Sequence, residues 1–181
     1  MIPLIVFLLA AGEPAGAQIA PMKIPVSVVR PTDRVSVSTM TSLEKRFNER
    51  LSTLFETNDQ LDLLGNTRGV YLEGFGAVFT AEVSLVVTPA ITPFRGKITK
   101  EFADGIRQKK IQRLPFLQAA MKEMLRNMGA TFIQVAEERQ MVLVVRFYYE
   151  PWEDMNGMPS QIVMKANRAN AMKGDVQMEV Q

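Results

Sequence analysis

Residues 141–149 read Met-Val-Leu-Val-Val-Arg-Phe-Tyr-Tyr, the clearest strand signal in this chain of 181 residues. β-Branched and aromatic side chains dominate the run, and its apolar residues follow one another without a helical spacing. A short, continuous apolar run of this kind is typical of a strand in the middle of a sheet. We therefore expect a central strand at these positions.

Further strands are expected on both sides of this segment. Downstream, Asn156-Gly157 is a hairpin turn signal, and residues 161–166 should return as the antiparallel partner strand. Upstream, residues 69–88 have the composition of strands, and residues 79–85 alternate between apolar and polar side chains. Gly74 and Gly76 mark a tight turn or a bulge. These two strand pairs predict an antiparallel sheet of about four strands.

Two stretches have helical spacing. The first opens at residues 41–42, and its apolar side chains recur three and four apart until Gly65-Asn66 closes the segment. Its apolar stripe packs either inside the domain or against a second copy. The second covers residues 98–128, where Gly105 and Pro115 predict a kink or two helices. The order helix, hairpin, helix, hairpin predicts an α+β fold with two main helices packed on the sheet.

Residues 1–17 have the pattern of a secretory signal. Residues 2–11 form an apolar core too short to cross a bilayer as a helix, and Ala15-Gly16-Ala17 supplies the small residues that a signal peptidase accepts. We expect cleavage after Ala17 and an exported protein, periplasmic or secreted. No Lys or Arg precedes the apolar core, so either the free α-amino group serves as the positive end or the start codon lies upstream. A buried N-terminal strand or a retained anchor is the competing interpretation of the segment.

The rest of the chain divides into three parts: an extended Pro-containing lead-in at 18–40, a single α+β domain at 41–167 and a polar, flexible tail at 168–181. Cysteine and histidine are absent from the whole sequence. Disulfides, thiolate nucleophiles, Cys/His zinc sites and imidazole-based triads are therefore excluded. We expect no cofactor and no catalytic residue stands out; the glycines before residue 77 lead into a strand, not the helix that a nucleotide loop needs.

The acidic loop around Trp152, Glu153 and Asp154 is the best place to look for a metal or for carboxylate catalysis. Calcium in an EF-hand frame would require oxygen ligands where Trp152 and Val163 stand, so that motif fails. Glu153 and Asp154 are neighbours in sequence, and nothing predicts that they converge on a substrate as a hydrolase pair. A solvated hairpin loop is the simpler interpretation, in which an exposed Trp152 could contact a peptide or a glycan.

A run of basic residues spans the start of the second helical stretch. Residues 95–113 contain seven Lys or Arg and two Asp or Glu. The four basic residues closest together are Arg107, Lys109, Lys110 and Arg113. They predict either a solvated helix face or a surface for anionic lipid headgroups or an acidic protein, since the export signal argues against nucleic acid.

These observations favour an exported, non-catalytic domain that binds a protein partner or itself, through a sheet edge, the first helix or the loop at 150–160. An envelope-associated module that binds anionic lipid or polymer through residues 95–113 is the alternative. A small hydrolase that depends on carboxylates comes third. The methionines at 121, 124 and 128 share one helix face, which indicates core packing more than a copper site.

Overall fold

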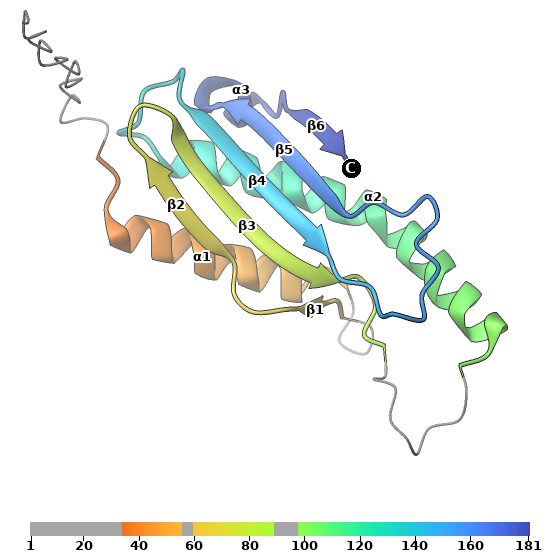
Figure 1. Cartoon of the computed structure of the whole chain (residues 1–181). Helices are drawn as coiled ribbons and strands as arrows, with labels where there is room; N and C mark the ends of the chain where they lie inside the picture. Colours follow the sequence, from red (N-terminus) through yellow and green to blue (C-terminus); the bar gives the residue numbers. More distant parts are fainter. Residues whose placement is uncertain (1–33, 56–59, 89–97) are drawn as a thin grey trace, which may run out of the picture.

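The predicted central strand is the middle of the sheet around which the chain folds. The computed structural model describes residues 34–55, 60–88 and 98–181, so the predicted signal sequence and most of the lead-in lie outside the described residues. Within them, the sheet forms one layer and the helices α1 and α2 form a second layer on one of its faces (Figure 1). Among the described residues, no helix combines the length and hydrophobicity that a membrane span requires.

Among the described residues the sheet has six strands rather than about four, and one pair is parallel. Its strands are β1 (Asp62–Leu63), β2 (Arg68–Leu72), β3 (Gly76–Ser84), β4 (Gln140–Phe147), β5 (Gln161–Asn167) and β6 (Gln177–Val180). The main order is β1-β3-β4-β5-β6, and β2 also pairs with β3. β3 and β4 are parallel and every other pairing is antiparallel. The expected antiparallel sheet is wrong at this point because the long helix between β3 and β4 acts as a crossover connection.

The turn between β2 and β3 confirms the hairpin interpretation of the glycines. β2 and β3 pair from Arg68↔Thr80 to Leu72↔Gly76. Gly76 has a φ of +136°, and a Cβ built on it would lie 1.9 Å from the carbonyl oxygen of Gln140. Only glycine lets β3 start this close to β4.

The first helix is shifted from its predicted position. α1 covers Val37–Ser52, and the Ser36 hydroxyl caps it by accepting a hydrogen bond from the Thr39 amide at 3.1 Å. The helix thus begins before residues 41–42, inside the predicted lead-in, and ends well before Gly65. The apolar spacing continues by coincidence, because Leu61 is buried in the core from a non-helical segment. The buried face of α1 consists of Met40, Leu43, Phe47 and Leu51.

The second helix is continuous. α2 covers Lys100–Thr131 with Pro115 inside it, so of the two expected arrangements the stretch is one helix and not two. Pro115 lies on the exposed side, beside the exposed Ile111, so water can satisfy the carbonyl that the proline leaves without an amide partner. The predicted methionine stripe is buried against the sheet, as core packing requires.

The polar tail is folded rather than flexible. After β5 the chain forms α3 (Arg168–Lys173), which Gly174 ends with a φ of +76°, and then β6, which pairs with β5. β6 alternates polar and apolar residues over only four positions, all exposed, so its sequence has too little apolar content to signal a strand. Backbone hydrogen bonds to β5, and not apolar content, hold these residues as a strand.

Candidate functional site

The basic run and the acidic loop, far apart in sequence, pack against each other. α2 is about 48 Å long and exceeds the strands, so its first half projects past the end of the sheet, where residues 148–160 lie beside it (Figure 1). There the Lys110 ammonium binds both carboxylate oxygens of Glu153, at 2.7 and 2.6 Å. The Lys110 side chain is 1% exposed and that of Glu153 is 5% exposed. The pair is therefore a buried ion pair.

Two arginines on the same helix also bond to the ends of strands and loops. The Arg113 guanidinium donates a hydrogen bond to the carbonyl of Leu85, just after β3. The central carbon of the same guanidinium lies 4.3 Å from the centre of the Phe55 ring. The Arg107 guanidinium donates to the carbonyl of Asn156 at 2.6 Å. Arg113 is 5% exposed. These cations hold backbone carbonyls of the sheet end and of the loop.

Tyr149 completes this group, which we call the α2–loop cluster: Arg107, Lys110, Arg113, Tyr149 and Glu153. The Lys110 ammonium lies 4.8 Å from the centre of the Tyr149 ring, and the phenol donates to the carbonyl of Pro159 at 2.6 Å. Burial, and secondarily the negative charge of Glu153, raise the pKa of Tyr149 to about 12. The phenol therefore stays protonated as a hydrogen-bond donor at neutral pH.

The solvated helix face expected for the basic run does not hold for Lys110 and Arg113, because both are buried. Lys109 is half-buried. In the acidic loop, the side chains of Glu153 and Asp154 diverge: Glu153 turns inward, whereas Asp154 is exposed and accepts from the Asn156 amide at 3.0 Å.

Trp152 is half-buried rather than exposed. Its ring centre lies 5.9 Å from that of Phe102 on α2, and its indole N–H has no hydrogen-bond partner in the described part of the chain. The α2–loop cluster thus joins a loop to a helix by buried hydrogen bonds and aromatic contacts. Across residues 34–55, 60–88 and 98–181, no three acidic side chains gather in a way that could hold a metal ion.

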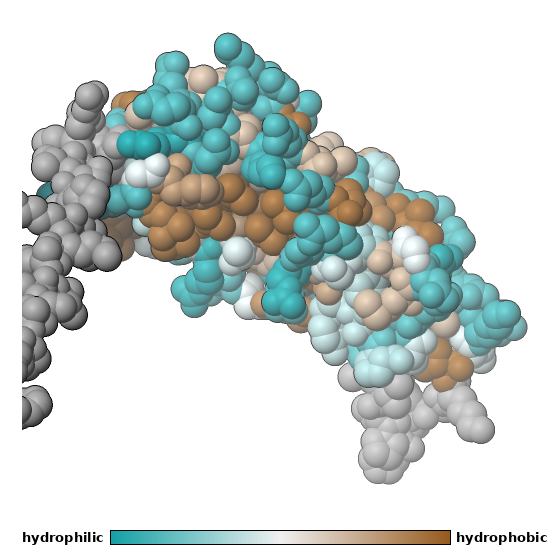
Figure 2. Space-filling view, turned by 45° about the horizontal axis from the view of Figure 1, so that its top comes forward, coloured by the Kyte–Doolittle hydropathy of each residue, from teal (hydrophilic) through white to brown (hydrophobic). Residues whose placement is uncertain are grey.

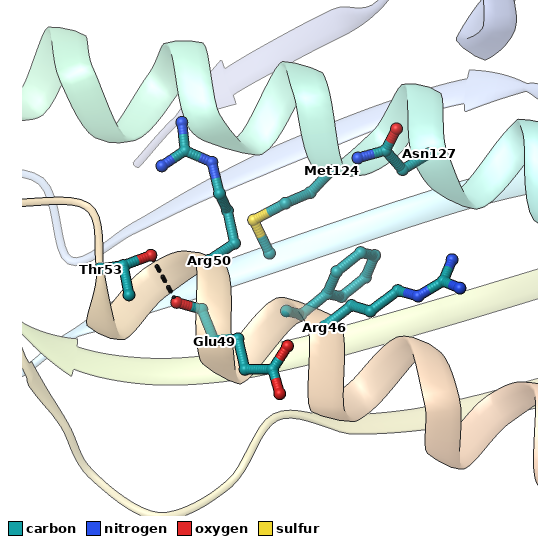
Figure 3. A pocket seen from close by; sticks show the side chains of 7 residues that line it. Arg46, Glu49, Arg50, Thr53, Met124 and Asn127 are labelled. Atoms are coloured by element: carbon teal, nitrogen blue, oxygen red, sulfur yellow. Dashed lines mark hydrogen bonds between the residues drawn. The ribbon is translucent and has the colours of Figure 1, made fainter.

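A groove runs between the two long helices. It has a volume of about 340 Å³, and the buried side chains of Phe47 and Met124 form its base. Arg46, Arg50 and Asn127 are among its other lining residues (Figure 3). The Arg50 guanidinium lies 3.0 Å from the carboxylate of Glu123 on α2. The groove is thus bridged by an exposed ion pair, and its apolar base belongs to the contact between α1 and α2.

The face of the sheet opposite the helices, which we call the open face, carries an apolar band. The strand register places Val70 beside Val78 and Val142, and places Val144 beside Val163. The band consists of Val70 and Leu72, which are 49% and 47% exposed, and of four half-buried residues, Val78, Val142, Val144 and Val163. Figure 2 shows hydrophobic residues (brown) running across this side of the molecule between hydrophilic margins (teal).

Sequence reasoning missed the open face as a candidate site, although the signal was present. β4 is apolar on both of its sides: Met141, Leu143 and Val145 point into the core, and Val142 and Val144 lie on the open face. A strand that alternates apolar and polar residues has one solvated face, whereas β4 has the composition of a strand covered on both.

Comparison with known proteins found no family model, no curated protein and no solved structure that matches the chain.

Proposed function

We propose that this protein is an exported, non-catalytic binding domain and that it binds a protein partner through the open face of its sheet. The apolar band is the observation that carries the proposal. It consists of Val70, Leu72, Val78, Val142, Val144 and Val163. A contiguous apolar surface with a polar margin is the usual composition of a protein-binding surface.

The composition of β4 supports the same conclusion. A strand that is apolar on both of its sides is typical of a strand with both faces covered, whereas a strand with one face in water alternates apolar and polar residues. The register pairs Val78 with Val142 across the parallel strands, and the next open-face position pairs Thr80 with Val144. The described helices cover the other face only, so a partner layer on this side completes the arrangement that the strands favour.

The other two surfaces considered from the sequence are less suited to the task. A basic face for anionic lipid would need the charges of Lys110 and Arg113 in solvent, and both side chains are buried. A carboxylate hydrolase would need Glu153 available to a substrate, and its two oxygens are bound to Lys110. Because these groups are buried, the open face is a better candidate for the binding surface than the loop or the basic run.

The test compares the proteins captured by the wild-type chain with those captured by Val144→Lys, a variant that places a charge within the band. Ile133→Lys is the matched control, because Ile133 is 75% exposed and lies just after α2, outside the strands. A bait tagged at its C-terminus is expressed in its own host and captured at low and at high salt. We expect a stoichiometric protein that survives high salt with wild type and with Ile133→Lys and is lost with Val144→Lys.

Footprinting of the captured complex locates the contact. Labelling of valine side chains by a photoactivated carbene should decrease at Val142, Val144 and Val163 when the partner is bound. A partner that Val144→Lys retains, or protection confined to the loop at 148–160, would contradict the proposal. Capture that high salt abolishes would favour the basic run instead.

A further inference from the structure

We infer that the protein occupying the open face is a second copy of this chain, packed face to face about a two-fold axis parallel to the strands. The inference rests on the proposed function and names its partner. It starts from one row of residues across the open face, defined by the strand register: Arg68 on β2, Thr80 on β3, Val144 on β4, Val163 on β5 and Glu179 on β6.

The two ends of this row carry opposite charges. Arg68 is exposed and makes no ion pair with any residue in the described part of the chain. Glu179, at the other margin, is held by the Lys165 ammonium, and both side chains remain partly exposed at 41% and 46%. The apolar Val144 and Val163 lie between these margins. The row therefore has a positive end, an apolar middle and a negative end.

A two-fold axis that runs along β4 in the plane of the interface makes this row complementary to itself. It turns the β2 margin of one copy onto the β6 margin of the other, so Arg68 meets the second copy's Glu179 twice, once at each margin. Val142 and Val144 then meet their own counterparts at the centre. Isologous contacts of this kind are the commonest in soluble oligomers.

The remaining charges on the open face tolerate this axis. Arg146 lies on β4 and meets its own counterpart, but the register places Glu82 beside it on β3. Each Arg146 is then about one strand spacing, about 5 Å, from the Glu82 of its own copy, and the other copy's Glu82 is offset from it by the same spacing along the facing sheet. An axis across the strands would instead place Arg68 over Leu72 and leave both margins unpaired. Charge complementarity therefore selects the axis parallel to the strands.

The open face is large enough for a stable pair. The 33 residues of β2 to β6 each occupy about 4.8 by 3.3 Å of the sheet, which gives about 520 Å² per copy. Both copies together would bury about 1,000 Å², about the minimum for a specific interface. Two sheets packed with their mean strand directions within about 30° of each other form such an interface in β-sandwiches.

Sedimentation velocity of the full chain, over a wide concentration range and in high salt, measures the association. We expect a dimer for wild type, and a dissociation constant about 100-fold or more weaker for Val144→Lys, which sets two ammonium groups against each other on the axis. Arg68→Glu and Glu179→Arg should each weaken the dimer about 10-fold, because each creates two like-charge contacts. Lys173→Glu, a charge reversal on α3, is the control and should leave it unchanged.

Mixing the two charge variants gives the decisive result. In a heterodimer of Arg68→Glu with Glu179→Arg, both marginal contacts are again between opposite charges, so the mixture should recover an affinity close to wild type. Equal weakness of the mixture and of each variant alone would overturn the axis. A wild-type chain that stays monomeric at millimolar concentration, while Val144→Lys still abolishes capture of a different protein, would overturn self-association and leave the proposed function intact.

Discussion

Removing the buried ammonium of Lys110 should destabilise the protein more than any other single charge change on α2. Lys110→Met keeps the length of the side chain but leaves the Glu153 carboxylate 5% exposed, with the Glu150 amide at 3.1 Å as its remaining donor. At an effective dielectric constant of about 20, opposite charges 2.6 Å apart attract each other by about 6 kcal/mol. Desolvation of both groups offsets much of this attraction in the intact pair, whereas the orphaned carboxylate keeps its own desolvation cost.

We therefore expect Lys110→Met to lower the free energy of unfolding by about 3–5 kcal/mol. Urea unfolding monitored by circular dichroism measures this loss. With a slope of about 2 kcal/mol per molar urea, the midpoint should fall by about 1.5–2.5 M. Lys122→Met is the matched control, because Lys122 is exposed on the same helix, and its midpoint should change by less than about 0.3 M.

The double variant separates a broken pair from a damaged core. Glu153→Gln removes the second charge, so Lys110→Met/Glu153→Gln should be less destabilised than the sum of the two single variants, by about 2 kcal/mol or more. Additive losses would refute the argument that the two charges depend on each other. A midpoint of Lys110→Met equal to that of Lys122→Met would refute the burial of the pair itself.

Three further predictions follow from single features of the fold. Burial raises the pKa of Tyr149 from an ordinary value of 10 to about 12, so the phenol's contribution to stability is complete below pH 10 and is lost as pH rises toward 12. Tyr149→Phe should therefore reduce the fall of the urea midpoint between pH 10 and pH 12. A fall as steep as that of wild type would contradict this prediction. Gly76→Ala should lower the free energy of unfolding by about 3 kcal/mol or more, because the new Cβ would meet the Gln140 carbonyl. Gly74→Ala in the same turn has no atom within 4 Å of the new Cβ and should lower it by about 1–2 kcal/mol. Thermal unfolding of both variants measures the two losses, and equal losses would count against the close approach of β3 to β4. Ser36→Ala should cost about 1 kcal/mol by removing the cap of α1, and amide hydrogen exchange in the first turn of α1 should accelerate; unchanged exchange would show that the cap has no effect.

The sequence predicted the elements of this fold better than their pairing. β4, β5 and the hairpin of β2 and β3 were predictable because strand periodicity and turn glycines are local properties. The parallel pairing of β3 and β4 was not, because two strands on either side of a long helix can pair in several ways. The end of α1 was missed because Leu61 continues a helical spacing while it lies outside the helix.

The candidate residues were chosen for their charge, and charge alone does not report burial. Lys110 and Lys109 are neighbours with the same chemistry, yet Lys110 is 1% exposed and Lys109 is half-buried. Their environments differ because Lys110 faces a loop whose position is set by β4 and β5, more than forty residues downstream. In contrast, Val142 and Val144 carried a signal in the sequence itself, because they make β4 apolar on both faces.

The ion pair and the open face follow from the same crossover connection. A parallel β3 and β4 require a helix between them, and α2, at about 48 Å, is longer than the strands of about 26 Å. Residues 148–160 pack against the part of α2 that extends past the sheet. Their backbone carbonyls and the Glu153 carboxylate accept hydrogen bonds from the cations of α2. Those residues therefore lie at the end of the sheet, and within 34–55, 60–88 and 98–181 both long helices lie on its opposite face (Figure 1). The apolar band on this uncovered face is the reason for our proposal that another molecule covers it, and the charges at its two margins are the reason for proposing a second copy.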